Sequence, residues 1–396
     1  MNSETTQALD KQVVEAVRAA IGPAAELVLL HRPYLPPTAW DYIKECLDTG
    51  WVSSAGSYVT RFEDELAKFT GVRRAVAVVN GTAALHVCLH LAGVRPGDEV
   101  ICPSLSFVAT ANAISHCSAI PHFVDANPEN LGLCPAALEA RLQEISQPNS
   151  GGLQNRETGR RIGAVVLMHC FGHPGSIAEV AAICERYSIP LIEDAAESLG
   201  SFYRGKHTGR SGLISAVSFN GNKILTTGGG GAILTDDSQL ADRAKHLTTT
   251  AKVPSPWEFY HDSVAWNYRL PNLNAAMGVA QLEILPQLIA AKRKLADRYR
   301  EAFHGISGLR FLTEPADTSS NYWLNGICLD TDDLELRNRI LTALNGANYQ
   351  SRPLWQPMHF LPMYAGCPRG EMKTTESLYR RIINIPSSPD LMLELR

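Results

Sequence analysis

Short apolar runs alternate with helical stretches through much of the N-terminal half, and this alternation limits the folds that the chain can adopt. Buried strands are predicted at residues 75–79, 99–102, 120–124, 163–169 and 189–193. Helical stretches lie between most of them. Such alternation is typical of an α/β domain with a mostly parallel sheet, whose ligands bind at the carboxyl ends of the strands.

Two further strands are expected at residues 216–219 and 231–234, close enough in sequence to form a hairpin. A run rich in Leu, Ala, Lys and Arg at 281–303 predicts a long helix that links the sheet to a C-terminal lobe. That lobe is expected to contain a strand at 322–329 and a helix at 333–345.

The chain has 396 residues, too many for one compact core, so we expect more than one domain. An N-terminal helical segment, 1–50, should pack on the body through an amphipathic helix over 13–30. A large domain should occupy 51–285, followed by a linking helix and a small domain at 286–396. The polar, glycine-containing segment 151–161 is expected to be a loop.

The composition excludes several classes of protein. A net charge of −4 and the lack of long basic runs argue against nucleic-acid binding. Residues 13–30 are interrupted by Glu15, Arg18 and Pro23, which makes them too polar to span a membrane. The polar N-terminus does not fit a signal peptide, and nine scattered cysteines are typical of reduced thiols rather than of disulfides or a zinc site. We therefore expect a cytoplasmic protein without a metal site.

Lys223 stands out because of the sequence around it. It ends the segment Ser-Phe-Asn-Gly-Asn-Lys at 218–223 and is soon followed by four glycines at 228–231. Upstream, Asp194 follows the predicted strand at 189–193. Pyridoxal phosphate (PLP) enzymes need a lysine that forms a Schiff base and an acid that partners the pyridine nitrogen. The combination predicts a PLP site, although either residue alone is more often a surface lysine or a structural carboxylate.

Other residues supply groups that such a cofactor needs. Gly81 and Thr82 lie between the first strand and a helix, where backbone amides can bind phosphate, although the same sequence also makes a simple helix cap. Phe107 follows the second strand and is a candidate to stack on a planar ring, the alternative being a core aromatic. Glu197 would share a face with Asp194 if a helix begins there, and is otherwise a solvated acid.

Taken together, these segments resemble the DegT/DnrJ/EryC1/StrS family of sugar aminotransferases. The matching segments run in order from about residue 33 to residue 388. They are 80–85, the strand end at Asp125, 171–174, 193–197, 218–231 and 267–269. The resemblance implies a fold-type I PLP enzyme, with a large domain on a mostly parallel sheet and a smaller C-terminal α/β lobe. It also implies a homodimer with shared active sites.

The resemblance implies a role for each matching residue. Lys223 matches the Schiff-base lysine, and Asp194 matches the partner of the pyridine nitrogen. Phe107 occupies the stacking position, and Asn267 matches an asparagine that reaches the phosphate of the neighbouring subunit's cofactor. Residues matching the phosphate binders are Gly81, Thr82 and Ser218. Position 197, near the cofactor's phenolic oxygen, is often glutamine in relatives, whereas this chain has glutamate.

Within the family, the chain is most similar to the subgroup from legionaminic-acid and related nonulosonate pathways. The segments that carry this likeness are 49–54, 171–174, 194–200 and 245–252, whereas Pro36-Pro37-Thr38 departs from a Gly-Asn-Glu-like segment in relatives. The subgroup implies transfer of an amino group from L-glutamate to C4 of a nucleotide-linked 4-keto-6-deoxy-N-acetylhexosamine. Lys223 would move the proton in each half-reaction.

Three other functions fit this sequence less well. A sugar dehydratase of the same fold carries histidine in place of the lysine, so Lys223 argues against it. A non-catalytic PLP-binding regulator is disfavoured because no DNA-binding segment is evident. An NAD-dependent sugar oxidoreductase would need a Gly-x-Gly-x-x-Gly segment after the first strand, which the sequence lacks.

Overall fold

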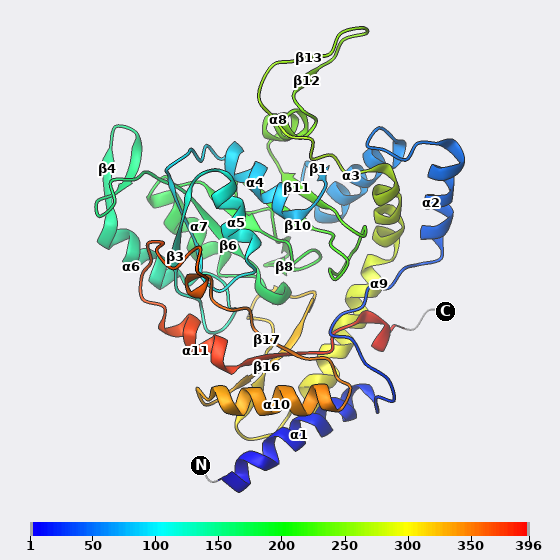
Figure 1. The fold of residues 1–396 in the computed structure, drawn as a ribbon, viewed down its shortest axis with the longest axis vertical. Helices are drawn as coiled ribbons and strands as arrows, with labels where there is room; N and C mark the ends of the chain where they lie inside the picture. The colour runs from blue at the N-terminus through cyan, green and yellow to red at the C-terminus, as the bar shows by residue number, and fades with distance from the viewer. Residues whose placement is uncertain (1–2, 394–396) are drawn as a thin grey trace.

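The computed structural model describes residues 3–393 and is built around a seven-stranded sheet (Figure 1). The strand order is β1 (Arg74–Val78), β11 (Gly231–Thr235), β10 (Ile214–Ser218), β7 (Leu191–Asp194), β6 (Ile162–Met168), β2 (Glu99–Pro103), β3 (Ile120–Val124). Only β11 runs antiparallel to its neighbours in this sheet; the other pairings are parallel. The predicted α/β class and the predicted β10–β11 hairpin are confirmed.

Helices cover both faces of this sheet, because its strands carry apolar residues on both sides. Along β1, Val76 and Val78 face one cluster with α4 (Gly81–Leu91), α5 (Ala109–His116) and α8 (Ser238–Thr248). The alternate residues Ala75 and Ala77 face a second cluster. That cluster includes α3 (Ser57–Thr70) and the first half of α9 (Asn272–Ala302). Two more helices, α6 (Pro135–Ile145) and α7 (Ile177–Arg186), cover β2, β3 and β6.

A smaller lobe follows the sheet domain. Its antiparallel sheet has the order β14 (Leu309–Phe311), β16 (Asn325–Leu329), β18 (Ile382–Ile385), β17 (Arg352–Pro353). Helices α10 (Leu334–Gly346) and α11 (Lys373–Arg381) complete the lobe. The long helix α9 joins the two parts, and α1 (Ser3–Ile21) lies beside α10 (Figure 1). The division of the chain at residues 50 and 285 stays a prediction.

Several predicted boundaries were wrong. The N-terminal helix stops at Ile21 rather than at residue 30, because Gly22 takes a left-handed φ of 87° and proline follows. Segment 151–161 is not a plain loop, since β5 (Gly152–Asn155) pairs with β4 (Ser146–Asn149). The linking helix begins at Asn272 instead of residue 281. The strand expected from residue 322 begins at Asn325, because Tyr322 has a φ of 47°.

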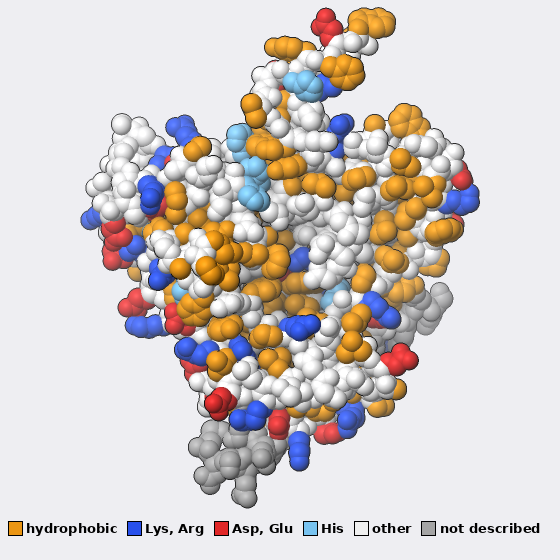
Figure 2. Space-filling view, viewed as in Figure 1, with side chains coloured by type: hydrophobic (Ala, Val, Ile, Leu, Met, Phe, Trp, Pro, Cys, Tyr) orange, Lys and Arg blue, Asp and Glu red, His pale blue; other side chains and the backbone are white. Residues whose placement is uncertain are grey.

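Three further features lie outside the two lobes' main sheets. The hairpin β12 (Lys252–Val253) and β13 (Tyr260–His261) projects from the molecule and carries exposed hydrophobic side chains, seen at the top of Figure 2. Helix α2 (Thr38–Thr49) also exposes Trp40 and Leu47. Short strands β8 (Phe202–Tyr203), β9 (Lys206–His207) and β15 (Thr318–Ser319) form a small separate sheet.

The structure places the nine cysteines as follows. All nine cysteines are free thiols, and Cys88, Cys102 and Cys170 are buried as small apolar side chains. Over residues 3–393, every helix is too short or too polar to cross a lipid bilayer. The same residues contain no group of three potential metal-binding side chains.

Replacing Gly278 with alanine should destabilise the protein. A Cβ at Gly278 in α9 would lie 2.6 Å from the ring of Phe62, which is fully buried in α3 and cannot move aside. Overpacking of this kind costs about 1–3 kcal/mol. The matched control is Gly346→Ala in α10, where a Cβ meets nothing within 4 Å. Urea unfolding should show a lower free energy of unfolding for G278A than for wild type, and an unchanged value for G346A. Equal effects of the two substitutions would contradict this packing.

Candidate active site

A cavity of about 330 Å³ opens at the carboxyl ends of the parallel strands. Most predicted site residues line it, although they come from different strand ends and loops. They are Gly81, Thr82, Phe107, Asp194, Glu197, Ser218 and Lys223. Two tryptophans of the smaller lobe, Trp323 and Trp355, close the other side. The exception is Asn267, an exposed residue that bridges to Thr249 outside the cavity lining.

A cradle for an anionic group forms where α4 begins. Asn80 caps this helix: its side chain accepts the amide hydrogen of Ala83 at 2.8 Å. The amides of Gly81 and Thr82 belong to the first turn, whose N–H groups have no intrahelical acceptors. A Cβ at Gly81 would lie 2.8 Å from the Cβ of Ser218, which brings a hydroxyl to the same place. The close approach explains why glycine is needed here.

Asp194 is the last residue of β7 and is buried at the cavity wall. One carboxylate oxygen accepts a hydrogen bond from the Thr110 hydroxyl at 2.8 Å, and that hydroxyl lies 2.7 Å from the hydroxyl of Ser106. Burial raises the pKa of Asp194, and the Thr110 hydrogen bond only partly opposes the shift. A cationic ring nitrogen in the cavity would favour the ionised carboxylate.

Glu193, the preceding residue, points to the opposite face of the strand. Its carboxylate accepts hydrogen bonds from His169 at 3.0 Å and from the amides of Gly209, Ser211 and Gly212. Burial opposes ionisation, but the His169 hydrogen bond and the backbone amides outweigh it and lower the pKa of Glu193 to about 2. Glu193 is therefore a structural anchor.

Lys223 projects into the cavity, where its side chain is 11% exposed. Its Nζ lies 3.4 Å from Oε1 of Glu197. The other oxygen of Glu197 accepts the amide hydrogen of Phe171 at 2.9 Å. Burial raises the pKa of Glu197 to about 7, although nearby Lys223 pulls it down. Glu197 reaches the cavity from a turn rather than from the helix considered for it.

Phe107 is 51% exposed at the cavity, so it is not the core aromatic that was the alternative for this position.

Asp125 lies away from the cavity, unlike most of the other matched residues. Its carboxylate accepts the amide hydrogens of Thr374 and Thr375 at 2.9 and 2.7 Å, at the beginning of α11. Asp125 therefore ties the smaller lobe to the end of β3.

Sequence reasoning missed two residues at this site, Thr110 and Trp323, whereas Trp355 belongs to a segment, 355–359, that the sequence offered as a candidate sugar contact. Thr110 had a weak signal, because it lies three residues after Phe107 and so on the same side of the following helix. Trp323 is 100 residues from Lys223 in sequence, and no local pattern points to its position.

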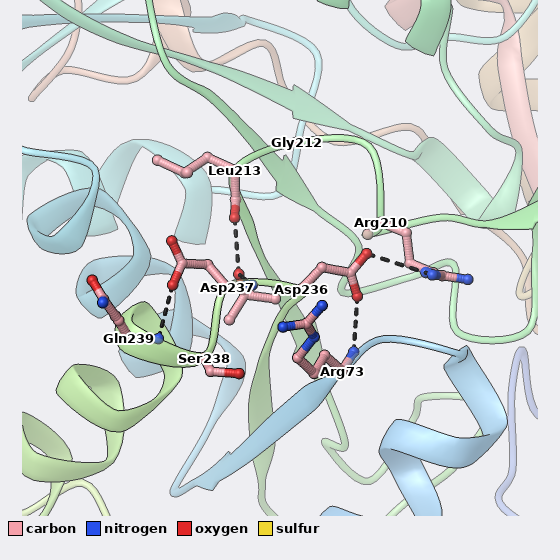
Figure 3. Close-up of a pocket in the computed structure, with 10 residues that line it drawn as sticks. Arg73, Arg210, Gly212, Leu213, Asp236, Asp237, Ser238 and Gln239 are labelled. Atoms are coloured by element: carbon pink, nitrogen blue, oxygen red, sulfur yellow. Dashed lines mark hydrogen bonds and ion pairs between the residues drawn. The ribbon is translucent and has the colours of Figure 1, made fainter.

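A second hollow of about 720 Å³ lies at the other end of the strands, beside the residues that precede β1 and β10 (Figure 3). Its charged groups bind one another: Asp236 accepts the amide hydrogen of Arg73 and contacts Arg210, and Asp237 caps α8. Because these groups are already used in local structure, the hollow is a poor candidate for the active site.

The chemistry of the first cavity fits PLP. The Gly81–Thr82 amides and the Ser218 hydroxyl suit a phosphate, the Asp194 carboxylate suits a pyridine nitrogen, and the Lys223 amine suits the aldehyde carbon. A parallel sheet with such a site defines a PLP-dependent aminotransferase of fold type I.

Comparison with known proteins identifies the family. The chain belongs to the DegT/DnrJ/EryC1/StrS aminotransferase family, whose profile matches residues 36–395. It is 36% identical to the putative pyridoxal phosphate-dependent aminotransferase EpsN of Bacillus subtilis, over 92% of each chain. It is 35% identical to the GDP-perosamine synthase of Vibrio cholerae, over 92% of this chain and 95% of the relative.

Solved structures agree with this assignment. The aminotransferase TlmJ from Streptoalloteichus hindustanus superposes with a TM-score of 0.82 at 28% identity, over 91% of this chain and 93% of TlmJ. The protein is therefore a PLP-dependent sugar aminotransferase, as its sequence predicted, and PLP is its cofactor.

Replacing Glu197 with glutamine should change how stability depends on pH. The carboxyl has a pKa of about 7 in the folded chain against an ordinary 4.5, so the folded chain holds its proton more tightly. As pH rises from about 4.5 to about 7, wild type should lose up to about 3 kcal/mol of unfolding free energy relative to E197Q. Urea unfolding of the cofactor-free proteins at several pH values measures this; parallel curves would contradict it.

Proposed function

We propose that the enzyme transfers an amino group from L-glutamate to C4 of a nucleotide-linked 4-keto-6-deoxy sugar. The main support for the proposal is that one cavity is lined by Lys223, Asp194 and the Gly81–Thr82 cradle, in a chain that belongs to a sugar aminotransferase family. The reaction would take place in the cytoplasm and supply amino sugars for surface polysaccharides or legionaminic-type nonulosonates.

When bound, PLP supplies the electron sink that makes the proton on the donor's Cα removable. Lys223 is the base that takes this proton and returns it to the cofactor carbon, a kind of help worth roughly 10²–10⁴-fold. Glu197, 3.4 Å from Nζ, is placed to exchange a proton with that amine. With PLP bound, Asp194 would hold the pyridine nitrogen in its protonated form. Trp323, which is 4% exposed, covers the amine on the side of the smaller lobe.

Two acceptor sugars are supported by different observations. The sequence segments shared with the legionaminic-acid subgroup favour a 4-keto-6-deoxy-N-acetylhexosamine. The 35% identity to a GDP-perosamine synthase favours a GDP-linked sugar instead. We take the N-acetylhexosamine as the first candidate and the GDP-linked sugar as the second.

We also propose a homodimer in which each subunit completes the other's site. The position of Asn267 supports this, because it is exposed and lies outside the cavity of its own chain. A second copy that presents Asn267 to the cradle would add an amide donor for the phosphate. The β12–β13 hairpin exposes two large apolar side chains, Trp257 and Phe259, which would be buried if a second copy packed against them.

The other functions weighed above receive less support. Lys223 lies in the cavity with its amine in place, which a histidine-bearing dehydratase would lack. A non-catalytic regulator would need no base beside Asp194, and Lys223 supplies one.

Lys223→Ala should abolish transamination. Loss of the base and of the covalent link to PLP should lower turnover by at least roughly 10²–10⁴-fold. Turnover of L-glutamate to 2-oxoglutarate, followed with a ketosugar acceptor, measures this. Lys206→Ala, at an exposed lysine outside the cavity, is the control and should retain activity. Full turnover by K223A would overturn the assignment.

The acceptor can be determined by a direct comparison. Enzyme that has first reacted with L-glutamate should regain its starting spectrum when mixed with the correct ketosugar. A UDP-linked 4-keto-6-deoxy-N-acetylhexosamine should act at lower concentration than a GDP-linked 4-keto-6-deoxyhexose. The reverse order would replace the first candidate with the second.

Mixing two inactive variants tests the shared site. If Asn267 serves the neighbouring subunit, a mixed dimer of K223A and N267A has one site with both residues intact. Subunit exchange between the two variants should therefore restore activity that neither has alone. If each site uses its own Asn267, no mixture will recover activity.

A further inference from the structure

Trp323 covers the amine of Lys223 from the side of the smaller lobe. The Nζ atom of Lys223 lies 3.8 Å from the centroid of the indole ring, well within the range of about 6 Å for a cation–π contact. Trp323 is 4% exposed and the Lys223 side chain is 11% exposed, so little water separates the two groups. Such contacts are stronger when both partners are desolvated.

Trp323 is held in this position by three hydrogen bonds, one from its indole ring and two at its backbone. Its Nε1 donates to the carbonyl of Asn222, the residue before Lys223, at 2.7 Å. Its backbone amide donates to Oδ1 of Asn321 at 2.8 Å. Its carbonyl accepts a hydrogen bond at 3.0 Å from Lys292, which is fully buried in α9. The ring cannot turn away from Lys223 without breaking the first of these bonds.

The same segment also binds the backbone of Glu197, whose carboxyl group is a second neighbour of the amine. Asn321 donates from its side chain to the carbonyls of Glu197 and Leu199, both at 2.9 Å. Glu197 in turn lies 3.4 Å from Lys223 Nζ. The amine therefore lies between an acid and the electron-rich face of an indole, and one segment of the smaller lobe positions both.

This arrangement matters because the lysine of an aminotransferase has two states. It is joined to the cofactor before the amino donor arrives, and it is a free amine in the interval that follows. A free amine that has taken up a proton must be kept near the reacting carbons until it returns that proton. An aromatic face attracts the ammonium without being able to take its proton, whereas the Glu197 carboxylate, 3.4 Å from Nζ, can exchange one.

We propose that Trp323 is a catalytic residue whose indole face holds the protonated Lys223 amine while that lysine is free of the cofactor. The inference rests on the proposed role of Lys223. It adds a residue that the sequence comparison with the family did not single out.

Trp355 lines the same cavity as Trp323 but makes different contacts. Its ring packs on Phe171, with centroids 5.1 Å apart, and it lines the cavity without a cation–π contact to Lys223 among residues 3–393. Trp355 is therefore a matched control for changes at Trp323.

The experiment changes the electron density of the ring while keeping its shape. Tryptophans with increasing numbers of ring fluorines are introduced at position 323, and separately at position 355, by a suppressor transfer RNA. The cofactor-free proteins are treated with N-hydroxysuccinimidyl acetate, which acylates only neutral amines. Acylation of Lys223 is measured by peptide mass spectrometry and divided by that of the exposed Lys206.

Each added fluorine at position 323 should speed acylation of Lys223, because a poorer π face stabilises the ammonium less. The most fluorinated ring should react roughly three- to tenfold faster than indole. Fluorines on the ring at position 355 should leave the acylation rate of Lys223 unchanged. A flat series at position 323, in proteins with unchanged melting temperatures, would overturn the proposal and leave Trp323 as a space-filling side chain.

A separate measurement keeps the two assignments apart. Borohydride reduction of the loaded enzyme, followed by peptide mapping, identifies the lysine joined to PLP. If that lysine is not Lys223, the role of Lys223 and the role inferred for Trp323 both fail. If it is Lys223 and the fluorine series is flat, only the inference about Trp323 fails.

Discussion

The close approach of backbone at Gly231 is the contact on which the active site depends. Gly231 pairs with Val78 on one side and with Ser218 on the other, since β11 runs antiparallel between β1 and β10. A Cβ on Gly231 would lie 2.6 Å from the carbonyl carbon of Asn80. Without a side chain there, the loop after β1 and the loop after β10 come together. The first carries the phosphate cradle and the second carries Lys223.

The alternation of side chains along β7 separates a structural acid from a chemical one. Glu193 points away from the cavity and is held ionised by His169 and backbone amides. Asp194 and Glu197 face the cavity, where burial raises the pKa of both carboxyls. One cation, Lys223, lies among them. A cofactor that brings a protonated ring nitrogen adds the charge that Asp194 needs, which gives an electrostatic reason for the site to bind PLP.

The sequence predicted those parts of the site that depend on local pattern. Asp194 ends an apolar strand, and Gly81 and Lys223 lie within a few residues after two others, so their meeting at one end of the sheet followed from its parallel strands. Trp323 could not be predicted because it comes from the other lobe, and its position depends on Lys292 and on the backbone carbonyl of Asn222. Sequence periodicity does not encode such contacts.

The errors in the fold have similar causes. Residues 22–30 are apolar, which predicted helix, but Gly22 ends α1 and Val28 instead forms a bridge with Tyr349 of the smaller lobe. The polar segment near residue 151 looked like a loop because its hairpin strands are largely exposed and carry no apolar alternation. In the first place a local helix stop outweighed apolar composition, and in the second a local hairpin formed without apolar alternation.

The measurement that tests the central claim most directly is the visible absorption spectrum of the purified protein, before and after addition of L-glutamate. The account predicts a yellow band from PLP joined to the enzyme, which bleaches as the donor's amino group is transferred. A protein that shows no band, even after incubation with excess PLP, would contradict the assignment of this cavity as a PLP site.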